Sequence, residues 1–302
     1  MRGIPEGQGE NIKGKITVEL ALWLELPTED VEKAIQSAFR LKAKIPKNKK
    51  FVGDCLIIFK DKEIKNKILH KSREKSWNVN GMNDKGKRNR IEHVLKKEGL
   101  DIICLQETHI ARKHKRTLIN SRLGNEFISS DQSKKRGVVI YIKKQIEAKS
   151  LFKDEEGRIS AVQINWQGEK IIIVGIYAPN VNKSEFYGRL EERLSDYADQ
   201  KIILLGDMNG VVSLEVDRLR DTKGKEGKLP RTFFSLVQNC NLVDIWRFRH
   251  PLEKQYTFYS EPNDSSSRLD QIWVSKELVP RSLRVEIQAR TISDHNPIKM
   301  EL

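Results

Sequence analysis

The sequence has no apolar run of the roughly 18 residues that a membrane-spanning helix needs. Its N-terminal residues lack the apolar core of a secretory signal peptide, and no targeting signal is recognisable in the chain. Only three cysteines are present, at widely separated positions, so neither a disulfide framework nor a zinc-binding pattern is visible. We therefore expect an intracellular protein, nuclear or cytoplasmic, that is not bound to a membrane.

Acidic residues are also in deficit. The chain holds 56 Lys and Arg against 42 Asp and Glu, which gives a formal net charge of +14 at pH 7. A surplus of this size favours a polyanionic partner, because each neutralised phosphate releases condensed counterions. The alternative is that the charge serves solubility alone. Composition leaves the oligomeric state open.

Two regions of the chain differ in their residue patterns. Residues 1–75 are Lys-rich, and their apolar spacing predicts a helix over 12–26, an extended segment over 31–45, a strand over 51–59 and a helix over 61–74. Residues 76–302 alternate helices, at 88–98 and 186–197, with many β-branched strands. Those strands are expected at 101–106, 137–142, 159–164, 171–177, 201–206, 242–246, 256–260, 268–274 and 298–302. Many strands with few helices predict a sheet-on-sheet core flanked by helices, and we place a domain boundary between residues 75 and 76.

Polar side chains follow several of these strands directly. Strand ends that meet at one rim of a sheet are where functional sites are built. The polar residues at these ends are Asn78, Asn80, Glu107, Tyr177, Asn180, Asp207, Asn209, Asp270, Ser293, Asp294 and His295.

Residues of these types suit the hydrolysis of a phosphodiester. That reaction needs a polarising cation, an activated water and neutralisation of the charge that develops on phosphorus. Magnesium prefers oxygen ligands and needs only one or two carboxylates, which Glu107 and either Asp294 or Asp270 can supply. His295 can orient or protonate the phosphate, with a carboxylate fixing its tautomer, and Asp207 can accept a proton from water.

Each motif alone is more typical of ordinary structure. A glutamate at a strand end is usually solvated, and Tyr177 alone fits a core residue at the end of a strand. The Gly206-Asp207-Met208-Asn209 segment fits a turn, and Ser293-Asp294-His295 fits a cap. Their joint occurrence in one order, each after an apolar strand, favours a common site.

The ordered motifs resemble a known superfamily. They are Trp77-Asn78-Val79-Asn80, Gln106-Glu107-Thr108, Tyr177-Ala178-Pro179-Asn180, Gly206-Asp207-Met208-Asn209, Leu269-Asp270 and Ser293-Asp294-His295. Together they resemble the exonuclease–endonuclease–phosphatase superfamily. Within it, the chain is most similar to the endonuclease domain of LINE-type retrotransposons, a relative of the apurinic/apyrimidinic endonucleases. The resemblance implies a four-layer α/β sandwich, in which two mixed β-sheets are flanked by helices.

The resemblance also implies a role for each motif. Glu107 would bind Mg²⁺, or Mn²⁺ in its place, with help from Asn78 and Asp294. Asp207, with Asn209 beside it, would align or deprotonate the attacking water. Tyr177 would contact the phosphate, and His295, paired with Asp270, would stabilise it. The product would be a DNA nick that carries a 3′-hydroxyl group, and the residues expected to contact DNA are Asn80, Asn180, Thr257 and Ser293.

Residues 1–75 separately resemble part of the RNA-recognition-like region of the retrotransposon's chaperone protein. The likeness rests on Gly3-Ile4-Pro5-Glu6 and on the segments at 35–40 and 64–74. It implies a small, incomplete α+β region that lacks a strand at each end and is a candidate for RNA binding. The junction departs from the endonuclease pattern, because Lys71-Ser72-Arg73-Glu74-Lys75 stands where an apolar strand is expected. We expect a truncated or polar first strand that still places Asn78.

Two other functions fit the same residues. A site of this kind can hydrolyse phospholipids or inositol phosphates, and release of inorganic phosphate would distinguish that activity from nicking of a plasmid. The chain could also be an inactive fragment that binds nucleic acid through its basic surface. All of the expected catalytic side chains are present, which counts against decay by substitution.

Overall fold

A computed structural model of the chain describes residues 11–24, 27–40, 55–61, 72–219, 227–260 and 265–302. The chain divides into two compact units, Met1–Lys71 and Ser72–Leu302. The boundary that we placed between residues 75 and 76 therefore falls inside a strand of the second unit. Within the described residues, every helix is too short or too polar to span a bilayer.

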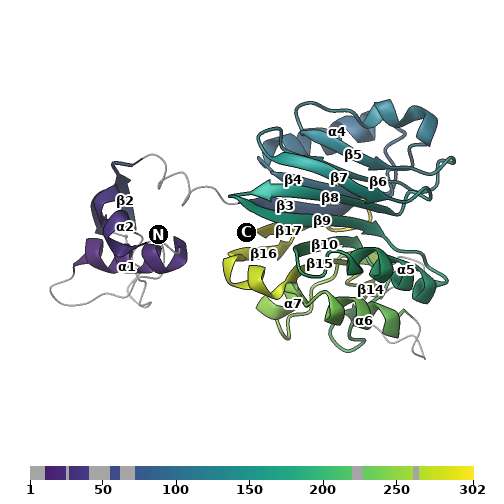
Figure 1. Cartoon of the computed structure of the whole chain (residues 1–302). Coiled ribbons are helices and arrows are strands. Elements are labelled where there is room, and N and C mark those ends of the chain that lie inside the picture. The colour runs from purple at the N-terminus through teal and green to yellow at the C-terminus, as the bar shows by residue number, and fades with distance from the viewer. Residues whose placement is uncertain (1–10, 25–26, 41–54, 62–71, 220–226, 261–264) are drawn as a thin grey trace, which may run out of the picture. The chain divides into compact units, whose positions relative to one another are not determined.

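The N-terminal unit is a small α+β structure. It contains α1 (Ile12–Leu24), α2 (Thr28–Ala34) and an antiparallel pair of strands, β1 (Ile35–Arg40) and β2 (Cys55–Phe59) (Figure 1). Helix α1 confirms the predicted helix. The predicted extended segment begins only at Ile35, because residues 31–34 complete α2. The helix predicted over 61–74 lies mostly outside the described residues, and its C-terminal end is wrong because residues 73 and 74 begin a strand.

The second unit is built on two mixed six-stranded sheets. The first sheet has the order β16-β17-β3-β4-β6-β5, and the second has the order β12-β15-β10-β9-β8-β7. The first comprises β3 (Arg73–Asn78), β4 (Ile102–Gln106), β5 (Asn125–Ser129), β6 (Val138–Ile142), β16 (Arg284–Ile287) and β17 (Ile298–Glu301). The second comprises β7 (Glu147–Lys153), β8 (Ile159–Trp166), β9 (Glu169–Tyr177), β10 (Lys201–Asp207), β12 (Leu242–Asp244) and β15 (Asp270–Ser275). A smaller sheet joins β11 (Arg218–Leu219), β14 (Ser265–Ser267) and β13 (Phe258–Ser260).

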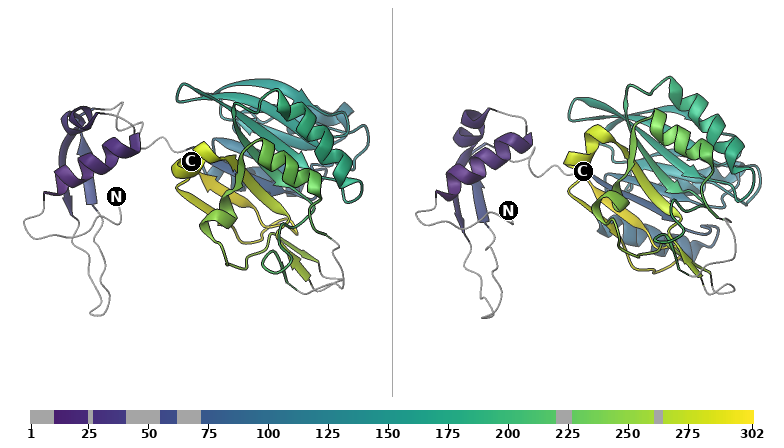
Figure 2. Two further views of the ribbon diagram at one scale, coloured as in Figure 1. Left: turned by 60° about the horizontal axis from the view of Figure 1, so that its bottom comes forward. Right: turned by 90° about the horizontal axis from the view of Figure 1, so that it is seen from below.

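The two large sheets pack face to face, and helices cover their outer faces (Figures 1 and 2). Apolar residues of both sheets, such as Ile140 and Leu205, share one core between them. Helix α4 (Lys85–Lys97) buries Ile91 and Leu95 against the outer face of the first sheet. Helices α5 (Lys183–Ser195) and α6 (Arg231–Asn239) cover the second sheet. The predicted four-layer α/β sandwich is confirmed, and the inner strands β4, β6, β9 and β10 are apolar runs because both of their faces are covered.

One predicted strand is shorter than expected. Residues 242–244 form β12, but residues 245–249 form the short helix α7 (Ile245–Arg249). The reason is local, since the Asp244 side chain accepts a hydrogen bond from the backbone N–H of Arg247 and so caps a helix. Two short 3₁₀ helices, Arg112–Leu118 and Lys276–Arg281, complete the unit.

Strand β3 is polar, as expected, and still carries Asn78 into the fold. It pairs in parallel with β4 and antiparallel with β17, so both edges are satisfied by apolar neighbours. Glu74 in this strand is fully buried. The Ser72 hydroxyl donates to its Oε1, while Oε2 has no hydrogen-bond partner among the described residues. Neighbouring strands, and not the apolar character of β3 itself, therefore hold this segment in the core.

The buried Glu74 carboxyl should make stability depend on pH. Burial, and then the nearby Asp101 carboxylate, raise the pKa of Glu74 from 4.5 to about 8 against the opposing Ser72 hydrogen bond. The folded chain then retains a proton that the unfolded chain releases above pH 4.5. This stabilisation is complete below that pH and is lost as the pH rises through about 8, by on the order of 5 kcal/mol in total.

Glu74→Gln should remove this dependence, because glutamine has the same shape and carries no titratable proton. In urea denaturation we expect similar free energies of unfolding for the two chains near pH 5. At pH 8.5 the variant should be more stable by on the order of 3 kcal/mol. A difference between the chains that stays constant over this pH range would contradict the assignment.

Candidate active site

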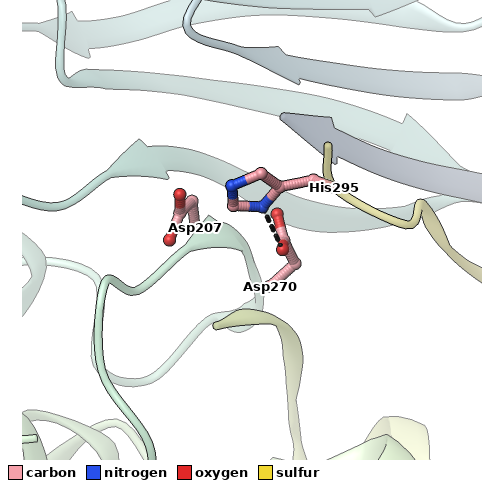
Figure 3. A group of neighbouring side chains, drawn as sticks. All are labelled: Asp207, Asp270 and His295. Carbon is pink, nitrogen blue, oxygen red and sulfur yellow. Dashed lines mark hydrogen bonds and ion pairs between the residues drawn. The ribbon is translucent and has the colours of Figure 1, made fainter. Parts of the chain in front are cut away.

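Three of the predicted site residues form one compact buried cluster. Asp207, Asp270 and His295 each offer a ligand atom, and these atoms lie within 4.8 Å of one another (Figure 3). Asp207 ends β10 and Asp270 begins β15, and the two residues are register partners in the second sheet. His295 comes from the segment before β17 in the first sheet. The cluster therefore lies at the edge where the two sheets meet.

His295 is fixed from several sides. Its Nδ1 lies 2.7 Å from Asp270 Oδ2, and its carbonyl accepts a 3.1 Å hydrogen bond from the Trp77 indole. The Phe258 ring packs against the imidazole, with 4.7 Å between the ring centroids. Burial alone lowers the pKa of His295, but the charges of Asp270 and then Asp207 outweigh it and raise the pKa to about 10. The neighbouring carboxylates therefore favour the imidazolium form of the ring, in which both nitrogens donate hydrogen bonds.

Asn78 connects two carboxylates that belong to different sheets. Its Nδ2 donates to Glu107 Oε1 at 3.0 Å and to Asp207 Oδ2 at 2.9 Å. Its Oδ1 accepts the backbone N–H of Asn80 at 3.0 Å. The Asn78 side chain is fully buried, and its hydrogen bond to Asp207 lies away from water, where it fixes geometry strongly.

Glu107 is held as a carboxylate. Its Oε2 lies 3.1 Å from His109 Nε2, and the Tyr177 side chain is also hydrogen-bonded to it. Burial raises the pKa of Glu107, but the hydrogen bonds from His109, Asn78 and Tyr177 outweigh that effect and lower it to about 2. Its backbone has φ 52°, a left-handed conformation that non-glycine residues rarely adopt and that clusters at functional sites.

The pKa of Asp207 is shifted in the opposite direction from that of Glu107. Burial, and then the charge of Asp270, raise the pKa of Asp207 to about 6, although His295 opposes the shift. Its Oδ1 accepts the backbone N–H of Asn209 at 2.8 Å, and Asn209 itself is anchored through a 2.5 Å bond from Nδ2 to the Ala178 carbonyl. A carboxyl with a pKa close to neutral is suited to exchange a proton with water.

A hollow of about 360 Å³ opens above these groups, and we call it the active-site hollow. The predicted residues that line it are Asn80, Glu107, Tyr177, Asn180, Asp207, Asn209, Asp294 and His295. Asn80 Nδ2 donates to both Asp294 oxygens at 3.2 Å. Lys183 and Arg218, to which we gave no role from sequence, also line it. Their isolated positions carry no pattern, because only the fold brings them to the site.

Thr257 and Ser293, both predicted to contact DNA, lie beneath the surface of the active-site hollow. Thr257 is fully buried, and its Oγ1 accepts the backbone N–H groups of Leu269 and Asp270 at 2.9 Å each. Ser293 is 6% exposed, and its hydroxyl donates to the Asn78 carbonyl at 2.7 Å. In the structure both hydroxyls are hydrogen-bonded to backbone groups, whereas Asn80 and Asn180 are exposed.

Comparison with known proteins locates this fold among nucleases. Residues 76–295 match the model of the Endonuclease/Exonuclease/phosphatase family. A DNA-(apurinic or apyrimidinic site) endonuclease of Dictyostelium discoideum is 30% identical over 254 residues, which cover 74% of this chain and 68% of that protein. The transposon TX1 uncharacterized 149 kDa protein of Xenopus laevis is 24% identical over 234 residues, which cover 74% of this chain. The chain spans 18% of the length of that transposon protein.

Solved structures show the same architecture. The crystal structure of AP endonuclease LMAP from Leishmania major has a TM-score of 0.68 at 21% identity, and the match covers 80% of this chain and 91% of that chain. The 3′-5′ exonuclease NExo from Neisseria meningitidis has a TM-score of 0.63 at 21% identity, over 76% and 99% of the respective chains. The family match begins at residue 76, so the likeness of residues 1–75 to an RNA-recognition-like region gains no support here.

The two roles open to Thr257 can be separated by substitution. Thr257→Val should leave the N–H groups of Leu269 and Asp270 without an acceptor, and urea denaturation should show a loss of about 2–4 kcal/mol. Thr257→Ser keeps the acceptor and should lose less than about 1 kcal/mol. If Thr257→Val were as stable as the parent but bound DNA more weakly, the hydroxyl would be a DNA contact instead.

Proposed function

Because the chain belongs to the endonuclease/exonuclease/phosphatase family, we propose that it is a Mg²⁺-dependent DNA endonuclease. It hydrolyses one phosphodiester bond and leaves a nick that carries a 3′-hydroxyl group. The observation that carries this proposal is the meeting of Glu107, Asp207 and the Asp270–His295 pair at one hollow. The reaction resembles target-site cleavage by a retrotransposon, and likeness to a transposon protein supports that context. Action on genomic DNA would take place in the nucleus.

The residues present fit a hydrated Mg²⁺ ion on the Glu107 side of the active-site hollow. Glu107 is ionised, and Asp294 adds a second carboxylate to the same hollow. Asn78 supports Glu107 from below through its amide. Oxygen donors and few protein ligands suit Mg²⁺, and Mn²⁺ accepts the same ligands. When bound, the cation polarises a phosphate oxygen and offsets the charge that develops during attack.

The buried cluster is a second place where an ion could be held, but its chemistry favours proton transfer. His295 is positively charged there and already shares a proton with Asp270. Its imidazolium can donate a hydrogen bond to the scissile phosphate and neutralise it. Asp207, ionised above about pH 6, can align the attacking water and accept its proton. Tyr177 lines the same active-site hollow, and a phosphate oxygen there would compete with Glu107 for its hydroxyl proton.

The basic surface supports DNA as the substrate. The net charge is +14, and the cationic side chains of Lys183 and Arg218 line the active-site hollow together with its carboxylates. Long-range attraction of this kind concentrates a polyanion at the site and accelerates its association. Relatives that are named as DNA endonucleases support the same substrate class.

Purified protein should nick supercoiled plasmid in Mg²⁺ and not in a chelator. Asp207→Ala and His295→Ala should each lower the nicking rate by at least about 100-fold, since each removes a proton-transfer or charge-stabilising group. Asp199→Ala and His93→Ala change the same residue types at exposed positions outside the site and should retain the parent rate. Nicking by Asp207→Ala or His295→Ala at the parent rate would refute the site assignment.

The ends of the nick should be a 3′-hydroxyl and a 5′-phosphate. A DNA polymerase should extend the nicked strand directly, without prior treatment by a 3′-phosphatase. Extension that depends on such treatment would show that the other ester bond is broken. Release of inorganic phosphate from inositol phosphates, without nicking, would instead support the phosphatase alternative.

A further inference from the structure

A second and larger hollow lies beside the active-site hollow. Its volume is about 550 Å³, and we call it the flanking hollow. It shares two lining residues with the active-site hollow, Phe258 and Asp294, so the two hollows meet at a common wall. Phe258 packs on His295 across that wall. The flanking hollow therefore adjoins the part of the active-site hollow that His295 lines.

Backbone hydrogen bonds hold the wall of the flanking hollow in place. The N–H of Asn296 donates to the Thr257 carbonyl at 2.6 Å, and Asn296 Nδ2 donates to the Tyr256 carbonyl at 2.8 Å. The N–H of Gln288 donates to the Pro297 carbonyl at 2.8 Å. Hydrogen bonds thus join the segments around residues 256, 288 and 296 to one another or to the residues next to them. The flanking hollow is therefore preorganised for a ligand.

The side chains around the flanking hollow have the chemistry of a nucleotide site. The Arg290 guanidinium lies 6.0 Å from the centroid of the Tyr259 ring, which makes a flat cationic and aromatic surface. Lys254 is exposed on the same hollow, with Gln255 and Gln288 beside it. Aromatic rings and guanidinium planes stack on bases of single-stranded DNA, and ammonium groups bind phosphates.

We propose that the flanking hollow binds one nucleotide of the cleaved DNA strand, next to the scissile phosphate. Its base lies against Tyr259 and Arg290, and its phosphate contacts Lys254. The proposal rests on the proposed endonuclease function, because it takes the strand at His295 to be DNA. The flanking hollow would thus be a subsite that helps to position the DNA strand relative to Asp207 and His295.

DNA binding without metal tests the flanking hollow independently of cleavage. Fluorescence anisotropy in chelator would give the Kd of the full chain for a labelled DNA duplex that carries a short single-stranded region. Tyr259→Leu should raise the Kd at least fivefold through loss of stacking. The double variant Lys254→Ala/Arg290→Ala should do the same and, because Lys254 is the one phosphate contact, lower the slope of log K against log salt by about 1.

A matched control separates this site from general charge. Lys149→Ala/Arg122→Ala removes the same two charges from exposed positions that line neither hollow, and its Kd should stay within about twofold of the parent. Unchanged binding by Tyr259→Leu, or an equal loss in the control, would overturn the proposal. A parent that binds with the expected pattern but never nicks DNA would instead refute the proposed function and leave the subsite standing.

Discussion

Two polar links across the boundary between the sheets hold the site together. The Asn78 amide joins Glu107 of the first sheet to Asp207 of the second, and the His295 ring of the first sheet is bonded to Asp270 of the second. The Asn78–Asp207 and His295–Asp270 bonds are buried, so breaking either one would leave a desolvated polar group without a partner. The chemistry therefore depends on how the two sheets are aligned, and the large apolar core between them fixes that alignment.

The same burial gives similar side chains different protonation states. Glu107 receives three hydrogen bonds and stays ionised, while Asp207 lies deeper beside Asp270 and holds its proton more tightly. His295 lies among carboxylates and keeps its positive charge. Environments that push the pKa values of neighbouring groups apart are how one site provides an anionic ligand, a proton acceptor and a cationic donor together. The protonation state of each side chain thus follows from its burial and its hydrogen-bond and charge partners more than from its residue type.

Sequence patterns predicted much of this arrangement. The apolar strands that end at Gln106, Tyr177 and Asp207 were recognisable because most of their residues are buried and polar residues stand at or just after their ends. The four-layer sandwich followed from those strands together with the motif order. Glu107, Asp207 and His295 reach the same active-site hollow, as the motifs suggested.

Other features depend on tertiary contacts that leave no local pattern. Strand β3 could be expected only as polar, because its neighbours supply the apolar surroundings and bury Glu74. Thr257 and Ser293 were expected to contact DNA from the family resemblance alone, and only the fold shows their hydroxyls hydrogen-bonded to backbone groups. Lys183 and Arg218 enter the site from separate segments, and no spacing rule connects them to the other residues. In each case the position of the residue depends on contacts with segments that are distant in the sequence.

The position of the cation is the most direct test of this account. Titration of Mn²⁺ into the intact chain, followed by electron paramagnetic resonance, would measure binding without any substrate. We expect one bound ion per chain, an affinity at least about tenfold weaker in Glu107→Gln, and little change in Asp270→Asn. Loss of binding in Asp270→Asn, with full binding retained in Glu107→Gln, would place the ion in the buried cluster and contradict the account.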